Sequence, residues 1–194
     1  DLRWQSHVLG AVDCALWDAK ARKAGQSVAE ISAIGRLGKK VPCYVSMISL
    51  DIDGPNSQEI AEALYHLGFW GQKWDLPEGP ESGASGLDRN LTRIKKLREV
   101  LPEGRLMIEL HRRWTPAYLR AFVDKMGDIN ITWFEDPFPV NHTRNYLTFG
   151  AGGTTICLGE KLNSPNAFAP FLEAGNFVLQ PDIIACGGYT AARY

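Results

Sequence analysis

The sequence lacks several features that would assign it to a specialised class of protein. It has no apolar run of roughly 18 residues, so no membrane-spanning helix is expected. Its first residues do not follow the basic, apolar and small-residue order of a secretory signal peptide. Positive and negative charges nearly cancel, with a formal net charge of -1. This balance gives no electrostatic reason to expect nucleic acid or an acidic membrane surface as a partner.

Cysteine is scarce, and no two cysteines form a CxxC pair. The four are far apart in the chain: Cys14, Cys43, Cys157 and Cys186. Each stands in an apolar stretch, so we expect buried free thiols in a reducing compartment such as the cytoplasm. Zinc is disfavoured because cysteine and histidine are not clustered.

What the sequence does contain is a repeat in which a short strand is followed by a helix. β-Branched and aromatic runs predict strands, and apolar residues at helical spacing predict helices. The expected strands are 42–47, 71–76, 105–110, 130–136, 154–160 and 176–182. The expected helices are 8–22, 57–67, 87–100, 116–126, 142–149 and 165–174, the last one bent or shortened by its proline.

Alternating strands and helices predict a parallel sheet with right-handed crossovers. A doubly wound sheet and a (β/α)8 barrel both fit this order. No GxGxxG or GxxxxGK loop follows the first strand, which weakens a nucleotide-binding interpretation. Six strands are too few to close a barrel of eight, so we expect the sequence to be part of a longer protein.

Ionisable residues end nearly every expected strand, one in each repeat. They are Lys73, Glu109, Glu135, Glu160 and Asp182. In a parallel β/α array these positions converge on the carboxyl edge of the sheet, which favours the barrel. Each could be a solvated strand end, but three converging glutamates repel one another unless a cation neutralises them. An all-oxygen site of this kind suits Mg²⁺.

Several motifs, in this order, resemble the mandelate racemase type of the enolase superfamily. They read AVDCALWDAKARKAGQSVAEI, GFWGQKW, LMIEL, WFEDP, LGE and QPDIIACGG. The resemblance implies an α/β fold, a TIM-type barrel of the modified (β/α)7β form with about six strands in this chain. Residues 1–41 would lead into the barrel and 42–194 would supply its first six repeats, with the N-terminal capping domain and last strands absent.

The resemblance also implies a chemistry and roles for three of the strand ends. The family abstracts the proton α to a carboxylate and stabilises the enediolate on Mg²⁺. It implies Glu109, Glu135 and Glu160 as metal ligands, with Glu109 in a position where the family usually has aspartate. Lys73 matches the first lysine of the family's Lys-x-Lys motif, which polarises the substrate carboxylate or tunes the base. Asp75 stands in place of the second lysine, the usual base.

The segment HRRWTP resembles the family's galactonate and mannonate dehydratases. Their acid-x-His pattern implies that His111 is the general acid or base that assists loss of hydroxide as water. In a strand, Glu109 and His111 would face the same side. Asp182 matches the aspartate that orients a catalytic histidine at the next strand end. Arg113 and Asn163 are further candidates for binding substrate oxygens, and each of these residues could instead be structural or solvated.

The resemblance therefore implies a Mg²⁺-dependent sugar-acid dehydratase, a lyase that forms a 2-keto-3-deoxy acid. A racemase, epimerase or cycloisomerase of the same superfamily is an alternative, although the missing second lysine counts against a base on each face. A non-catalytic or truncated homologue that serves as an interaction domain is another. The expected partners are a small hydroxy acid or sugar acid and, by resemblance, further copies of the chain in a homo-oligomer.

Overall fold

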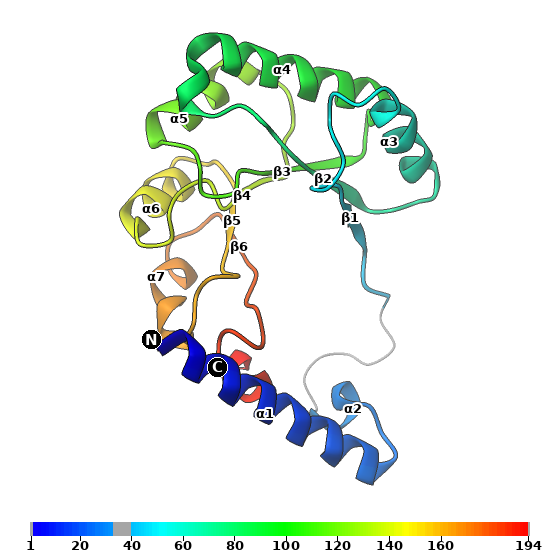
Figure 1. Cartoon of the computed structure of the whole chain (residues 1–194), viewed down its shortest axis with the longest axis vertical. Helices are drawn as coiled ribbons and strands as arrows, with labels where there is room; N and C mark the ends of the chain where they lie inside the picture. The colour runs from blue at the N-terminus through cyan, green and yellow to red at the C-terminus, as the bar shows by residue number, and fades with distance from the viewer. Residues whose placement is uncertain (1, 33–39, 194) are drawn as a thin grey trace. The chain divides into compact units, whose positions relative to one another are not determined.

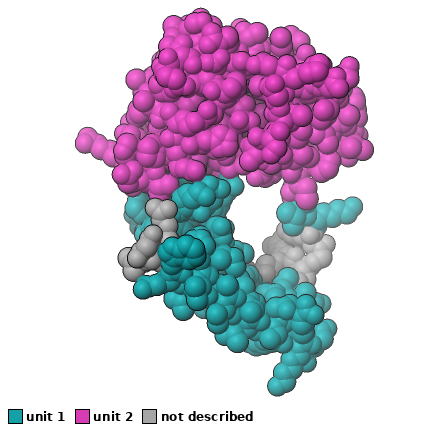
Figure 2. All heavy atoms as spheres, in the orientation of Figure 1, with its two compact units in different colours: residues 1–41, 158–173, 179–194 teal, residues 42–157, 174–178 magenta. Residues whose placement is uncertain are grey.

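The computed structural model describes residues 2–32 and 40–193, which form two compact units (Figures 1 and 2). Unit 1, teal in Figure 2, comprises residues 1–41, 158–173 and 179–194. Unit 2, magenta, comprises residues 42–157 and 174–178. In the part of the chain that is described, no helix is both long and apolar enough to cross a bilayer. The predicted domain boundary at residue 42 and the predicted missing segments stay predictions.

The strands form one sheet in which neighbours in sequence are neighbours in space. Their bounds are β1 Tyr44–Ser46, β2 Gly71–Asp75, β3 Arg105–Glu109, β4 Trp133–Glu135, β5 Ile156–Leu158 and β6 Phe177–Leu179. The pairs from β1 to β5 are parallel. The predicted α/β fold with a parallel sheet is therefore confirmed, and each strand is shorter than its expected range.

The helices of unit 2 cover the outer face of these strands, as Figure 1 shows for α3, α4 and α5. Their bounds are α3 Ser57–His66, α4 Gly83–Val100, α5 Pro116–Met126 and α6 Thr143–Ala151, with a 3₁₀ turn, η1, at Pro80–Ser82. The predicted apolar stripe of α4 is buried at Leu91, Ile94 and Leu97. Helix α5 begins as predicted, because the Thr115 hydroxyl accepts the Tyr118 N–H.

Side chains alternate between the two faces of the strands, as expected for extended backbone. The apolar residues Leu106 and Ile108 of β3 alternate with Met107 and Glu109, and all four are buried. On the face of Met107, a cluster forms with Trp133 and Cys157. Met107 and Trp133 are each two residues before the glutamate that ends their strand. The strand-end side chains therefore lie next to a buried apolar cluster.

Unit 1 contains α1 Leu2–Ala24, α2 Val28–Ser32, η2 Pro165–Ala167, α7 Ala169–Leu172 and α8 Tyr189–Ala192. Helix α1 packs against α8 through polar contacts, since Thr190 donates from its N–H and its hydroxyl to the Asp13 carboxylate at 2.9 and 2.6 Å. The apolar face expected on this helix is exposed in the structure, including Val12 (53%) and Leu16 (66%). Amphipathic spacing identified the helix but not the side on which it packs.

Two other local expectations differ from the structure. The segment expected as one helix from 165 to 174 is divided at Phe168 into η2 and α7, and Pro170 lies in the first turn of α7, where its missing N–H is tolerated. The cysteines are free, as expected, and Cys157 and Cys186 are buried. Cys43 is exposed and Cys14 half-buried, so the expectation of burial is wrong for Cys43.

Candidate active site

Two of the predicted carboxylates come together at the carboxyl edge of the sheet in unit 2. Glu109 ends β3 and Glu135 ends β4, and the strand register pairs them directly. Only 6% of Glu109 and 4% of Glu135 is exposed. Burying two neighbouring acids in an apolar setting is unfavourable unless protons or cations compensate their charge.

Lys73 supplies part of that compensation. Its ammonium nitrogen donates a short hydrogen bond to Oε1 of Glu135 and lies 3.5 Å from Oε2 of Glu109. Burial favours the neutral amine, but the hydrogen bond and the charge of Glu135 outweigh it, so the pKa of Lys73 is raised. The lysine therefore carries its positive charge between the two carboxyl groups.

A proton on the Glu109 carboxyl supplies the rest of the compensation. Burial raises the pKa of Glu109 to about 8, and its hydrogen bond with the Glu135 carboxyl acts in the same direction. The backbone N–H of His111, which donates to Oε1 of Glu109 at 2.7 Å, only partly offsets this. Near neutral pH the Glu109 carboxyl is mostly protonated, so a proton and an ammonium group neutralise the pair.

His111 lies beside this cluster, although not for the reason expected from strand alternation. Strand β3 ends at Glu109, and His111 has a left-handed backbone with φ +51°. Its ring still comes close to two acids, with Nδ1 3.6 Å from Oε1 of Glu109 and Nε2 3.7 Å from Oδ2 of Asp75. Burial lowers the pKa of His111, against the opposing effect of Asp75. The imidazole is thus neutral and half-buried at the edge of the cluster.

The backbone around His111 is strained and held in place by its neighbours. Arg112 and Asp136 also have positive φ angles, of +60° and +43°. The Arg112 N–H donates to the Asp136 carbonyl at 2.6 Å, and the two side chains form an ion pair. Non-glycine residues adopt a positive φ at a cost of roughly 1–3 kcal/mol each, and such residues concentrate at functional sites.

Two contacts at this edge were not identified from the sequence. Asp75, considered there only as a substitute for lysine, is the acid next to Nε2 of His111. Trp133 donates its indole N–H to Oε2 of Glu135 at 3.1 Å. The signal was present for Trp133, because Trp133 and Glu135 are two apart in β4 and residues two apart in a strand share a face. A cavity of about 190 Å³ opens beside Asp75, walled by Pro77 and residues 48–52.

The other predicted residues have local partners. Glu160 is exposed and lies 3.2 Å from the Lys161 ammonium. Asp182 caps a turn by accepting the N–H groups of Ile184 and Ala185. These residues, like Asn163, whose carbonyl accepts the Ser6 hydroxyl, belong to unit 1. Arg113 is an exposed residue of unit 2 that donates to the Leu76 carbonyl at 2.8 Å.

The structure thus brings together Lys73, Glu109, Glu135 and His111. Among residues 2–32 and 40–193, no three His, Cys, Asp or Glu side chains are grouped closely enough to hold a metal ion. The Glu109–Glu135 pair nevertheless suits a cation chemically, because it consists of carboxylate oxygens that already contact an ammonium group. The set of three ligands that adds Glu160 stays a prediction.

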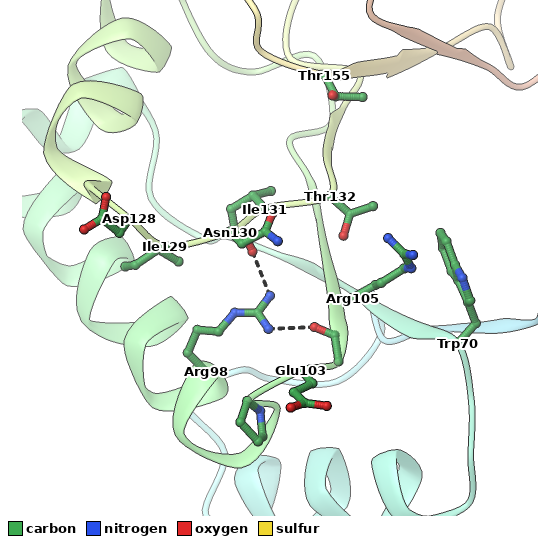
Figure 3. Close-up of a pocket in the computed structure, with 12 residues that line it drawn as sticks. Trp70, Arg98, Glu103, Arg105, Asp128, Ile129, Asn130, Ile131, Thr132 and Thr155 are labelled. Atoms are coloured by element: carbon green, nitrogen blue, oxygen red, sulfur yellow. Dashed lines mark hydrogen bonds between the residues drawn. The ribbon is translucent and has the colours of Figure 1, made fainter.

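A larger cavity of about 810 Å³ opens at the other end of the strands (Figure 3). Arg98, which lines it, donates to the backbone carbonyls of Leu101, Gly104 and Asn130 and so joins two loops. None of the predicted site residues lines this cavity. The hydrogen bonds of Arg98 therefore stabilise loops at the amino edge of the sheet.

Comparison with known proteins identifies the family to which the chain belongs. Residues 57–194 match the family model for enolase C-terminal domain-like proteins. The chain belongs to this family. Its six-stranded parallel sheet corresponds to the barrel domain of the enolase superfamily.

The relatives include proteins named as a dehydratase and as a cycloisomerase. The chain is 28% identical over 191 residues to a putative L-rhamnonate dehydratase of Caldivirga maquilingensis, covering 95% of this chain and 44% of that protein. It is 28% identical over 189 residues to a D-galactarolactone cycloisomerase of Agrobacterium fabrum, covering 94% and 48%. The chain therefore spans about half the length of these curated relatives.

A solved structure extends the likeness to three dimensions. Rhamnonate dehydratase from Gibberella zeae, crystallised as a complex with Mg, superposes with a TM-score of 0.81 at 25% identity. The match covers 96% of this chain and 44% of that one. The predicted family and fold are confirmed by these comparisons.

Proposed function

We propose that the protein is a Mg²⁺-dependent dehydratase of a sugar acid. The observation that carries the proposal is the buried Glu109–Glu135 pair with Lys73 between the carboxyl groups and His111 beside them. Two of the relatives are named as rhamnonate dehydratases, one of them crystallised with Mg. A dehydratase of this superfamily needs acids for the metal, a cation for the substrate carboxylate and a proton donor for the leaving hydroxyl.

In this proposal Glu109, Glu135 and Glu160 hold the metal. When bound, Mg²⁺ supplies positive charge that stabilises the anionic form of the substrate after its α-proton has left. Lys73 binds the substrate carboxylate through its ammonium group. This assignment is supported by its charge and by the contact of its ammonium group with Glu135, which ends β4 at the carboxyl edge, where barrels of this kind put their chemistry.

His111 acts as the general acid. Its imidazole lies at the half-exposed rim, where it takes up a proton to become an imidazolium beside the Asp75 carboxylate, and it gives that proton to the departing hydroxyl, which leaves as water. The α-proton passes to a further catalytic group that Asp182 would orient, the β-hydroxyl leaves as water with the proton from His111, and the resulting enol becomes a 2-keto-3-deoxy acid. Arg113 and Asn163 would contact substrate oxygens.

A cycloisomerase is the second candidate, because the Agrobacterium fabrum relative is as similar to this chain as the dehydratase of Caldivirga maquilingensis. Both reactions begin with loss of the α-proton. They differ in what leaves, since dehydration releases water and cycloisomerisation does not. The presence of His111 next to the carboxylate cluster favours dehydration, because it supplies a proton donor for a leaving hydroxyl.

The test is to incubate the purified protein and Mg²⁺ with aldonic and aldaric acids and their lactones, including L-rhamnonate and D-galactarolactone. Mass spectrometry then reads the product. Dehydration lowers the mass by one water, whereas epimerisation and cycloisomerisation leave it unchanged. We expect loss of water, abolished in His111→Asn while Mg²⁺ binding persists. Isomerised products without loss of water would favour the second candidate, and no reaction with any acid would contradict both.

A further inference from the structure

The position of Lys73 has a consequence for how the site takes up a metal. Its ammonium group contacts Glu135 and lies 3.5 Å from Glu109, so it occupies the space between the two carboxyl groups. Only 7% of Lys73 is exposed. Few positions in a protein interior tolerate an ammonium group, and this one depends on the two acids.

The surroundings hold the lysine in that place. The Tyr44 ring lies 6.0 Å from its nitrogen, close enough for a weak cation–π attraction. On the far side, the indole N–H of Trp133 fixes the second oxygen of Glu135 at 3.1 Å. Glu135 therefore has one oxygen bound to Trp133 and the other to Lys73. A metal ligated by this carboxylate would compete for the oxygen that Lys73 now occupies.

An ammonium group and a divalent cation cannot share this space. Both are positive, and at separations of a few ångströms in a buried site their repulsion is large. We propose that Lys73 is a built-in counter-ion that stabilises the metal-free protein and that a divalent cation displaces. The inference rests on the proposed function, which places the metal at Glu109 and Glu135. It adds an order of events, since the ammonium becomes free to bind a substrate carboxylate only after the metal has entered.

The first test uses Lys73→Met, which removes the charge and keeps most of the length of the side chain. The control is Lys125→Met, because the Lys125 ammonium is exposed and pairs with Asp88 at 2.8 Å, away from the carboxylate cluster. Calorimetric titration gives the Mg²⁺ affinity, and thermal unfolding in EDTA gives the stability of the metal-free protein. We expect Lys73→Met to bind Mg²⁺ roughly tenfold more tightly or better, because a competing charge is gone. We also expect it to melt at a lower temperature in EDTA, while Lys125→Met matches the wild type.

The second test uses the wild type, so it does not depend on the variant folding. Reductive methylation followed by peptide mass spectrometry measures how fast each lysine amine reacts. In EDTA we expect Lys73 to be protected by its two carboxylate partners relative to Lys125. Saturating Mg²⁺ should raise the labelling rate of Lys73 several-fold and leave Lys125 unchanged.

The outcomes separate this inference from the proposed function. Two results would contradict displacement of Lys73 by the cation (called the exchange below) while leaving the proposed metal site supported. The first is Mg²⁺ binding by the wild type with unchanged labelling of Lys73. The second is Lys73→Met binding Mg²⁺ no more tightly than the wild type. If neither the wild type nor Lys73→Met takes up Mg²⁺, both the exchange and the metal-dependent function are wrong. Faster labelling of Lys73 with Mg²⁺, together with tighter binding by Lys73→Met, supports the exchange.

Discussion

The buried Glu109 carboxyl should make the metal-free protein lose stability as the pH rises. Its pKa is about 8 in the folded chain, against an ordinary value of 4.5. A group whose pKa is raised by folding binds its proton more tightly in the native state. Its contribution to stability is therefore complete below pH 4.5, declines as the pH rises and is lost above about 8.

The size of the effect follows from the same difference. At about 1.4 kcal/mol per pKa unit, the span from 4.5 to about 8 corresponds to roughly 5 kcal/mol in the free energy of unfolding. This is a large fraction of the roughly 5–15 kcal/mol that stabilises a typical domain. The cause is burial, because only 6% of Glu109 is exposed and an ionised carboxylate there would lack the hydration that stabilises its charge.

Glu109→Gln is the informative variant, because an amide has the shape of the protonated acid and stays neutral at every pH. Its NH₂ can donate to the Glu135 carboxyl as the acid proton does. We expect urea unfolding in EDTA, followed by tryptophan fluorescence from about pH 5 to about pH 9, to show a steep loss of stability in the wild type and a much flatter profile in Glu109→Gln. Glu103→Gln, at an exposed position, is the control and should follow the wild type. An equally steep loss in Glu109→Gln would refute the reasoning.

Three further substitutions test the packing that positions the site. Gly150→Ala should destabilise the protein by roughly 1–3 kcal/mol, because the added Cβ would lie 2.4 Å from the Phe177 ring, and thermal unfolding measures this. Thr115→Ala should cost about 1 kcal/mol in urea unfolding by removing the N-cap of α5. Tyr146→Phe should cost roughly 1–2 kcal/mol in the same assay, because the buried hydroxyl donates to the Phe138 carbonyl.

Matched control variants separate these specific causes from a non-specific loss of stability on substitution. Gly152→Ala adds the same methyl group where the nearest atom is 3.4 Å away, so it should be close to neutral. Thr115→Ser keeps the capping hydroxyl and should retain the stability that Thr115→Ala loses. If Gly152→Ala were as harmful as Gly150→Ala, contact with Phe177 would not be the reason.

The sheet and its strand ends were predictable because their physical signals are local. Apolar runs closing on Glu109 and Glu135 fixed both the strands and the edge at which the carboxylates meet. The role of Lys73 as their counter-ion was not predictable. It depends on the ammonium group of a β2 residue reaching carboxyl groups on β3 and β4.

Other features could not be obtained from periodicity. The chain leaves β3 at Glu109 in a left-handed turn, so His111 reaches the site by a bend that no alternation rule describes. The apolar face of α1 was also predicted to be buried, but it is exposed. The spacing of apolar residues identifies a helix face but not what packs against it. Asp75 was recognised as a departure from Lys-x-Lys, and its place beside His111 became visible only in three dimensions.

The most direct measurement of the central claim is a calorimetric titration of Mg²⁺ into the wild type and into Glu109→Gln, Glu135→Gln and Glu160→Gln. If three carboxylates from successive strands hold one cation, the wild type takes up one Mg²⁺ per chain and each substitution weakens binding by at least about tenfold. No uptake by the folded wild type, or unchanged affinity in Glu160→Gln, would contradict the three-carboxylate site.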